Sequence, residues 1–276
     1  MWKLAAFADE IAPEIDVQIE HCRRNAVAFI ELRGVSGKNV LDLDDALRRE
    51  IKRKLDDSGI GIIAIGSPIG KIRIDEPFAP HLERFKIAVE LAEFFAAPFI
   101  RIFSYYPAEN ETHADLLARH RDEVLRRTQA KIEYLRGHAP VLVHENEAKI
   151  YGEKALQCLD LLTSINSPAF RAAFDFANFV QAREDVLKAW EMLKDYVVHI
   201  HVKDALAGDG KIVPAGMGDG HIAEILRDAA RRGYHGVLSL EPHLAHAGQY
   251  QGFSGPELFK VAADALKKVV DGLPRG

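Results

Sequence analysis

The chain has little cysteine, and this excludes two kinds of structure. Its 276 residues include only Cys22 and Cys158, which are far apart and in no spacing typical of a metal site. They provide no disulfide framework and fit a reducing compartment, so we expect a cytoplasmic protein. No apolar run approaches the length of a membrane span, and the first residues reach Asp9 too soon for the apolar part of a signal peptide. We therefore expect no membrane partner.

An excess of basic charge and a glycine-rich loop are also missing. The formal net charge is −5 and the pI is about 6.2, which is untypical of a protein that binds nucleic acid or an anionic membrane. The first apolar run is followed by ADEIAPEI, without the Gly-x-Gly loop that usually follows the first strand of an open, doubly wound sheet. These absences argue against nucleic acid as a partner and against an open sheet.

Eight short apolar runs are present, and they alternate with amphipathic helical segments. The runs are LAAF (4–7), AFIEL (28–32), IGIIAIG (60–66), FIRIF (99–103), VLVHE (141–145), RAAFD (171–175), VVHIHV (197–202) and VLSLE (237–241). Strict alternation indicates a parallel sheet, and a strand with its helix takes roughly 30 residues. We therefore predict an α/β fold, a (β/α)8 TIM barrel in which residues 1–276 form one domain.

Four polar residues stand where the last four runs end. They are Glu145, Asp175, His201 and Glu241, separated by 30, 26 and 40 residues. Successive strand residues face opposite sides, and each of the four shares a face with the residue two positions before it. The other faces are mostly apolar and suit packing against outer helices. All four are thus predicted to point into the barrel at the carboxyl ends of its strands, where barrel enzymes keep their chemistry.

A single polar residue after a strand is more often a helix cap or a solvated loop residue. Four residues of the same parity on successive strands are harder to explain in that way. Three carboxylates converging on one point would also repel one another unless a cation neutralised them. We predict that the four residues bind one divalent ion, Mn²⁺, Mg²⁺, Co²⁺ or Zn²⁺. His199 lies one layer deeper and is expected to be a hydrogen-bonded interior histidine or a support for the site.

The segments VLVHENE, AFDFANFV, HIHVKDA and LSLEP resemble successive motifs of the xylose isomerase-like TIM barrel superfamily. That group includes sugar and sugar phosphate isomerases and epimerases, hydroxypyruvate isomerases, inosose dehydratases and, more distantly, endonuclease IV. The resemblance spans nearly the whole chain and is weak for substrate. It implies that Glu145, Asp175, His201 and Glu241 hold one ion. It also implies that Glu145 and Glu241 transfer protons through a metal-stabilised enediolate, and it leaves open which of them abstracts.

The chain departs from some members of the superfamily. Ketose 3-epimerases of this kind have a histidine where this chain has Asn178, and an arginine shortly after the metal histidine, where it has Lys203 and Asp204. The Lys-Asp pair looks more like the inosose dehydratase branch and the uncharacterised isomerase-like branches. Endonuclease IV has additional histidines at the ends of its early strands, and the corresponding segments ELRG, AIGSP and RIFSY have none. DNA repair is therefore disfavoured.

Several further residues are candidates for contact with a substrate at the same rim. Glu147 is expected either to bind substrate hydroxyls or to form a salt bridge at the loop mouth. Lys203 is expected to meet an oxyanion or phosphate, or to neutralise Asp204 or Glu241. Asn178, Ser67 and Lys71 are weaker candidates.

Two other features have simpler explanations. Arg101 and Glu31 face inward, and an interior ion pair accounts for both. The segment GMGDG (216–220) opens a helix, so its amides could hold an anion, although an N-cap at Asp219 is the simpler expectation.

The predicted function is that of a metal-dependent isomerase or epimerase of a small sugar or sugar derivative. The main alternative is a dehydratase, a lyase acting on an inosose-like or sugar-acid-like substrate at the same site. A non-catalytic sugar-binding protein would be favoured by loss of a ligand or a glutamate, and neither is lost. The expected partner is a small sugar-like molecule, and a homo-oligomer is possible.

Overall fold

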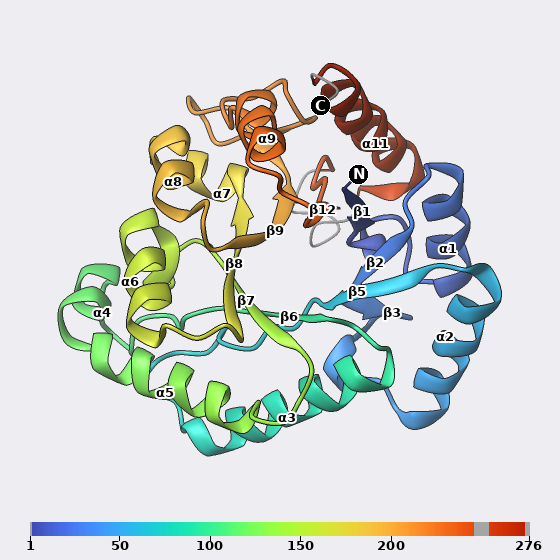
Figure 1. Cartoon of the computed structure of the whole chain (residues 1–276). Helices are drawn as coiled ribbons and strands as arrows, with labels where there is room; N and C mark the ends of the chain where they lie inside the picture. The colour runs from blue at the N-terminus through green and yellow to red at the C-terminus, as the bar shows by residue number, and fades with distance from the viewer. Residues whose placement is uncertain (1, 246–253, 274–276) are drawn as a thin grey trace.

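The computed structural model describes residues 2–245 and 254–273, and these form a closed barrel of eight parallel strands (Figure 1). In chain order the strands are β1 (Lys3–Ala6), β2 (Phe29–Leu32), β5 (Gly61–Ile65), β6 (Phe99–Ile102), β7 (Val141–Glu145), β8 (Phe170–Asp175), β9 (Val197–Val202) and β12 (Val237–Leu240). Each strand pairs with the next one along the chain, and β12 pairs with β1. The predicted (β/α)8 barrel is confirmed.

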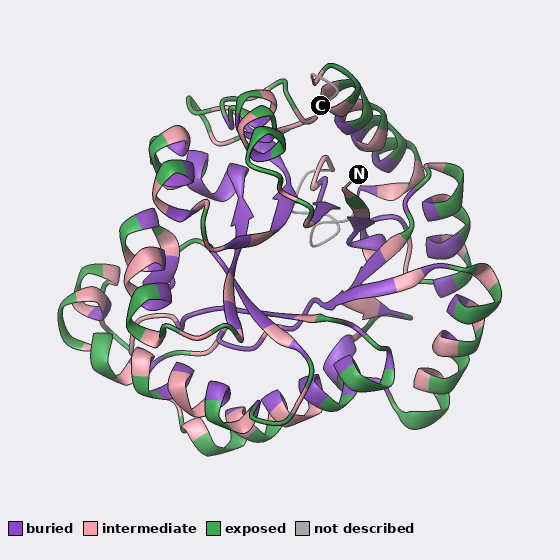
Figure 2. Ribbon diagram, in the orientation of Figure 1, coloured by how far each residue is buried: buried purple, intermediate pink, exposed green. Residues whose placement is uncertain are grey.

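A ring of helices covers the outside of the barrel. The helices are α1 (Ile15–Arg24), α2 (Asp45–Ser58), α3 (Phe78–Phe94), α4 (His113–Arg119), α5 (Arg121–Tyr134), α6 (Ala155–Ile165), α7 (Phe176–Gln181), α8 (Val186–Leu193), α9 (Ile222–Arg231) and α11 (Gly255–Asp271). Their buried faces turn toward the strands and their exposed faces turn outward (Figure 2). No helix in residues 2–245 and 254–273 is long and apolar enough to cross a membrane.

Helix α2 illustrates how local sequence places an outer helix. The side chain of Asp44 accepts the N–H of Leu47 and so caps the first turn. Gly59 ends the helix in the left-handed region at φ 73°, which glycine adopts without a steric cost. Ile51 and Leu55 are one turn apart and both are buried, so the helix packs one stripe of its surface against the barrel.

Short elements occupy the loops that follow four of the strands, β1, β2, β7 and β9. The 3-10 helix η1 (Ala8–Glu10) follows β1, the hairpin β3 (Gly34–Val35) and β4 (Lys38–Asn39) follows β2, and η2 (Val40–Asp42) follows that hairpin. The hairpin β10 (Asp204–Ala205) and β11 (Ile212–Val213) follows β9, and η3 (Tyr151–Glu153) lies between β7 and α6. Helix η1 and the segment after β2 bring side chains to the carboxyl ends of the strands, where Arg33 meets Asp9 and Glu10.

The interior of the barrel is apolar toward the amino ends of its strands, which form the floor of the barrel. Ala5, Ile63, Ala64 and Val237 form a small cluster with Phe29 and Phe99, separate from the main core between strands and helices. Above this floor the inward positions become polar, beginning with Glu31 and His199. The floor therefore closes the barrel from below and leaves the chemistry at the opposite end of the strands.

The last loop before α9 differs from the expectation of a helix beginning at Asp219. The helix begins at Ile222, after His221, which has a left-handed φ of 53°. Asp219 is instead held in the loop, because its N–H donates to the carbonyl of Ala205 and its carboxylate accepts the N–H of Ala207. The expected N-cap at Asp219 is thus wrong.

Candidate functional site

The four predicted ligands converge at the carboxyl end of the barrel. Glu145 ends β7, Asp175 ends β8, His201 lies in β9, and Glu241 follows β12 directly. One ligand atom from each of the four lies within 4.8 Å of the others. None of the four residues is more than 3% exposed. The structure therefore gathers residues that are nearly 100 positions apart into one buried cluster.

Strand register explains why the cluster forms. Asp175 pairs with His201 in the β8–β9 ladder, and His201 pairs with Ser239 in the β9–β12 ladder. Glu241 is two residues beyond Ser239, and so it points to the same side one level higher. Glu145 pairs with Ala173, two residues before Asp175. Side chains that alternate along neighbouring strands thus meet at the rim.

Three cations of the chain accompany these carboxylates. Lys203 Nζ lies 3.1 Å from Asp175 Oδ2 and 3.1 Å from Glu241 Oε2. Arg101 Nη1 lies 3.1 Å from Glu145 Oε2. Arg33 Nη1 lies 2.8 Å from Glu241 Oε1. Arg33 was missed by the sequence prediction, although its parity with Glu31 marks it as inward-facing.

The ion pairs correct one step of the sequence argument. Repulsion among three carboxylates was expected to require a bound cation, but Lys203, Arg101 and Arg33 already provide positive charge beside them. Arg101 and Glu31 were expected to be explained by an interior ion pair, and each has an interior partner, but not the other residue: Arg101 pairs with Glu145 of the cluster, whereas Glu31 lies against His199 and His201. Repulsion alone therefore does not demonstrate a metal.

The donor atoms themselves fit a divalent ion. Asp175 Oδ2 and both ring nitrogens of His201 are buried, and they form no hydrogen bond of good geometry among the described residues, although charged groups lie 3.0–3.3 Å from each of them. A buried polar atom without a partner is costly, and coordination to an ion is one way to satisfy it. Three carboxylates and one imidazole form a ligand set that Mn²⁺, Mg²⁺, Co²⁺ or Zn²⁺ accepts. The residues present thus suit one hard or borderline cation.

The charges in the cluster depend strongly on one another. Burial alone would raise the pKa of Glu145, but His201 and Arg101 outweigh it and lower this pKa to about 2. Burial would lower the pKa of Lys203, but Asp175 and Glu241 raise it well above its usual range. Burial raises the pKa of Asp175 to about 7, although Lys203 opposes the shift.

A buried chain of side chains lies directly beneath the cluster. His201 Nδ1 is 3.0 Å from Glu145 Oε1, and His201 Nε2 is 3.3 Å from Glu31 Oε2. Glu31 Oε2 is also 2.7 Å from His199 Nε2. Glu31, His199 and His201 are each 0% exposed. His199 is therefore a hydrogen-bonded interior histidine, in keeping with the first of its two expected roles.

Two aromatic rings lie between the cations Arg33, Arg101 and Lys71 at the mouth of the barrel. The ring of Phe7 lies 4.6 Å from the guanidinium carbon of Arg33 and 4.8 Å from that of Arg101. The ring of Phe103 lies 4.9 Å from that of Arg101 and 4.3 Å from Lys71 Nζ. Such contacts stabilise a cation by about 0.5–2 kcal/mol each, and they keep like charges apart.

The remaining candidates fall into two groups. Asn178 and Ser67 are buried and support neighbouring residues. The N–H of Asn178 donates to Asp175 Oδ1 at 2.7 Å, its side chain donates to the carbonyl of Asn146 at 2.7 Å, and Ser67 Oγ donates to the carbonyl of Arg101 at 2.5 Å. Lys71 and Glu147 are partly exposed at the rim and form an ion pair at 2.8 Å. This pair is the salt bridge at the loop mouth that was one of the two expectations for Glu147.

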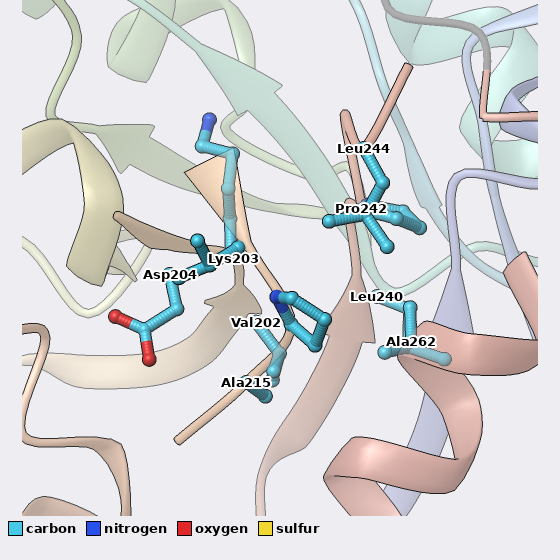
Figure 3. A pocket seen from close by; sticks show the side chains of 10 residues that line it. Val202, Lys203, Asp204, Ala215, Leu240, Pro242, Leu244 and Ala262 are labelled. Atoms are coloured by element: carbon cyan, nitrogen blue, oxygen red, sulfur yellow. The ribbon is translucent and has the colours of Figure 1, made fainter. Parts of the chain in front are cut away.

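Lys203 and its neighbour Asp204 point apart after β9 (Figure 3). Asp204 accepts the N–H groups of Gly216, Gly218 and Gly220 at 2.9–3.0 Å. The amides of the GMGDG segment thus hold an anion of the chain itself. A Cβ at Gly218 would lie 2.5 Å from Asp204 Oδ1, so this close approach requires glycine.

A small cavity of about 10 Å³ lies beside Lys203 and Asp204 and is lined mainly by apolar side chains of β9, β12, the β10–β11 hairpin and α11 (Figure 3). It has room for about one water molecule and is separate from the cluster of carboxylates. The three hydrogen bonds that Asp204 accepts hold the backbone beside this cavity in place, and the side chain of Lys203 extends from that backbone toward the carboxylates.

Comparison with known proteins agrees with this arrangement. The family model described as xylose isomerase-like TIM barrel matches residues 19–269. The chain belongs to this family. No curated protein matches it. The membership confirms the resemblance inferred from the four strand-end motifs.

Several solved structures have the same fold. The probable 3-DHS dehydratase AsbF of Bacillus anthracis is 20% identical, with 96% of this chain and 98% of that chain covered and a TM-score of 0.74. A D-tagatose 3-epimerase-like protein is 15% identical, with 98% and 97% covered and a TM-score of 0.75. A xylose isomerase-like TIM barrel protein from Mycobacterium smegmatis, in complex with magnesium, is 16% identical, with 99% and 98% covered and a TM-score of 0.73. At these identities the likeness establishes the fold alone.

Proposed function

We propose that the protein is a divalent-metal-dependent isomerase or epimerase of a small sugar or sugar derivative. The observation that supports this most is the convergence of Glu145, Asp175, His201 and Glu241 within 4.8 Å at the catalytic end of a family barrel. Solved structures similar to this one include epimerases and a dehydratase, which supports a polyhydroxylated carbonyl compound as the substrate.

The four residues divide into ligands and proton carriers. A bound divalent ion would polarise a substrate carbonyl and the hydroxyl beside it, and this would acidify a carbon-bound proton. Asp175 and His201 serve as ligands only. Glu145 and Glu241 come from different sides of the mouth, and the low pKa of each keeps it ionised and able to accept a proton. One glutamate removes the proton from carbon. In an isomerisation the same glutamate returns that proton to the neighbouring carbon, and in an epimerisation the other glutamate takes up a proton from solvent and delivers it to the opposite face.

The cations around the cluster assist this transfer. Lys203 is 6% exposed and lies between two ligand carboxylates, where its ammonium can stabilise negative charge that develops on a substrate oxygen. Arg101 and Arg33 hold Glu145 and Glu241 in fixed orientations through their ion pairs. Lys71 and Glu147 lie farther out and are placed to contact hydroxyls at the distal end of a substrate.

A dehydratase is the second candidate, and two observations favour it. One of the similar structures is a probable dehydratase, and Lys203-Asp204 stands where ketose 3-epimerases of this superfamily were expected to have an arginine. The first step is the same, removal of a carbon-bound proton by a glutamate. The reactions differ afterwards, because a dehydratase breaks the adjacent C–O bond, forms a carbon–carbon double bond and releases the hydroxyl as water after protonation.

Hydrogen exchange tests the shared first step. The protein, loaded with Mn²⁺ or Mg²⁺, is incubated in deuterated water with a panel of ketoses, sugar acids and inososes, and deuterium at carbon is measured by mass spectrometry. Glu145→Gln and Glu241→Gln are each expected to slow exchange about 10²–10⁴-fold. Glu191→Gln, which changes an exposed carboxylate on α8, is the control. Unchanged exchange in both active-site variants would exclude the proton-transfer roles.

Product mass then separates the two candidates. An isomerase or epimerase gives a product of unchanged mass apart from deuterium, whereas a dehydratase gives a product lighter by one water. Metal content after dialysis, with and without a chelator, tests the ion independently of turnover.

A further inference from the structure

The strongest unassigned feature is the buried carboxylate of Glu31 below the cluster. Glu31 comes from β2, whereas both histidines that it contacts come from β9. Strands β1 and β12 lie between β2 and β9 in the barrel wall. The side chain of Glu31 therefore reaches His199 and His201 through the barrel interior and not through a neighbouring strand.

Local backbone geometry and small neighbours make this reach possible. The pairing of β2 with β5 shifts register between Ile30 and Glu31, an irregularity of the kind that redirects a side chain. Ala173 pairs with His199, and Ser239 pairs with both His201 and Ala5. These three small side chains leave room at the level that the carboxylate of Glu31 occupies.

An ionised carboxylate at this depth needs donors. Glu31 is 0% exposed and stands above an apolar floor, where an unpaired charge would cost several kcal/mol. The donors near its Oε2 atom are His199 Nε2 at 2.7 Å and His201 Nε2 at 3.3 Å. Nε2 of His201 is the ring nitrogen that faces Glu31, and the other ring nitrogen, Nδ1, faces Glu145 at 3.0 Å.

We propose that Glu31, held by His199, is the positioning residue that fixes the ring of His201 with Nδ1 directed at the ligand cluster. This inference rests on the proposed function only in that the cluster is taken to bind an ion. A histidine that binds a metal through one nitrogen commonly donates its other N–H to a carboxylate, which sets both the tautomer and the orientation of the ring. Glu31 has the place and the contacts for that task.

Metal affinity and ring protons together test the proposal. Binding of Mn²⁺ is measured by electron paramagnetic resonance in the full-length protein, and the ring N–H protons of His199 and His201 are observed by NMR in the metal-free protein. In Glu31→Gln, which keeps the shape and removes the charge, the Mn²⁺ dissociation constant is expected to rise about 10–100-fold. The two ring protons, deshielded by the carboxylate in the wild type, are expected to move upfield.

Matched variants make the result specific. Ser239→Ala changes a buried hydroxyl in the same layer that has no hydrogen-bond partner among the described residues, and it is expected to leave the dissociation constant unchanged. His199→Gln removes the support of Glu31 and is expected to give a smaller loss than Glu31→Gln, and it serves as the test if Glu31→Gln fails to fold.

Three results would overturn the proposal. The first is an unchanged Mn²⁺ affinity in Glu31→Gln. The second is a stoichiometry of two ions per wild-type chain, because Glu31 and His199 would then be ligands themselves. The third is a pair of ring protons that Glu31→Gln does not move. If the wild type bound no ion, the proposed function would fail, and the ring protons would still decide the role of Glu31.

Discussion

The two halves of the barrel differ in the charges that they contribute to the cluster of Glu145, Asp175, His201 and Glu241. The ends of β7, β8 and β12 supply Glu145, Asp175 and Glu241, whereas Arg33 follows β2 and Arg101 lies in β6. Lys203, after β9, brings a cation from the second half as well. The acids converge on one point, and the cations surround that point and are separated by the rings of Phe7 and Phe103. One half thus provides a ligand set, and the other provides the charge that allows it to be buried.

Among the proposed variants, removal of Arg33 is expected to lower the free energy of unfolding most. This side chain pairs with Asp9, Glu10 and Glu241, so Arg33→Met leaves three carboxylates without their shared cation. Removal of one partner of a buried pair commonly costs about 3–5 kcal/mol, and we expect a loss of that size in the free energy of unfolding. Urea denaturation measures it. Arg53→Met disrupts an exposed pair with Asp57 and should cost less than about 0.5 kcal/mol. Equal losses in both variants would mean that the buried network adds no stability.

Lys203 tests whether a side chain and an ion compete for the same carboxylates. Lys203→Met removes the ammonium between Asp175 and Glu241, and the metal-free variant should lose about 3 kcal/mol of stability. An added divalent ion should restore it, and the rise in melting temperature with Mn²⁺ should exceed that of the wild type, because no ammonium has to be displaced. If neither protein responds to any of the four ions, the cluster is held by side-chain cations alone and the metal site is excluded.

The first half also buries a lysine that has no carboxylate partner in residues 2–245 and 254–273. Lys131 of α5 is 0% exposed, and its Nζ donates to the hydroxyl of Tyr105 at 2.6 Å. Burial, helped by Arg127, lowers the pKa of Lys131 from 10.5 to about 7. Between these two values the unfolded chain binds more protons than the folded one, so stability rises with pH.

We therefore predict that the free energy of unfolding rises more steeply with pH in the wild type than in Lys131→Met. From pH 7 to 8.5 the wild type should gain about 2 kcal/mol of stability relative to Lys131→Met, at 1.36 kcal/mol for each pH unit. Urea denaturation across this range measures both proteins. Lys188→Met removes a lysine whose side chain is 82% exposed, and it should retain the wild-type slope. Parallel curves for the wild type and Lys131→Met would show that Lys131 stays charged when buried.

The two halves also differ in how far they could be predicted. Strand parity predicted that Glu145, Asp175, His201 and Glu241 converge, because side chains of the same parity at neighbouring strand ends are directed to one side by their backbone. The same parity makes Glu31, Arg33 and Arg101 inward-facing, but long side chains can pair with several partners, and parity does not choose among them. The carboxylates that Arg33 contacts belong to η1 and to the loop after β12. Both segments are distant from Arg33 in the sequence, so the pattern of residues around Arg33 does not predict these contacts.

The loop residues illustrate a second limit. The glycines of GMGDG indicated a set of free amides, and such a set is equally suited to a ligand or to an anion of the chain. Asp204 takes that place, twelve residues before the first of them. Asn178 was read as a specificity position because it departs from a family motif, yet its backbone and side chain both support neighbours. Such choices are made by tertiary contacts.

The smallest effect on stability is expected for the ion pair between Lys71 and Glu147 at the rim. Lys71, from the loop after β5, and Glu147, from the loop after β7, join the two halves at 2.8 Å, and their side chains are 32% and 24% exposed. Solvent screens such a pair, so Lys71→Met and Glu147→Gln should each change the free energy of unfolding by less than about 1 kcal/mol. If both contact the distal end of a substrate, each variant should raise KM several-fold and leave kcat nearly unchanged, since binding lost equally in ground and transition states does not alter kcat. A fall in kcat with constant KM would instead place this pair among the groups that act on the reacting carbon, and the division between an acidic centre and a supporting rim would have to be redrawn.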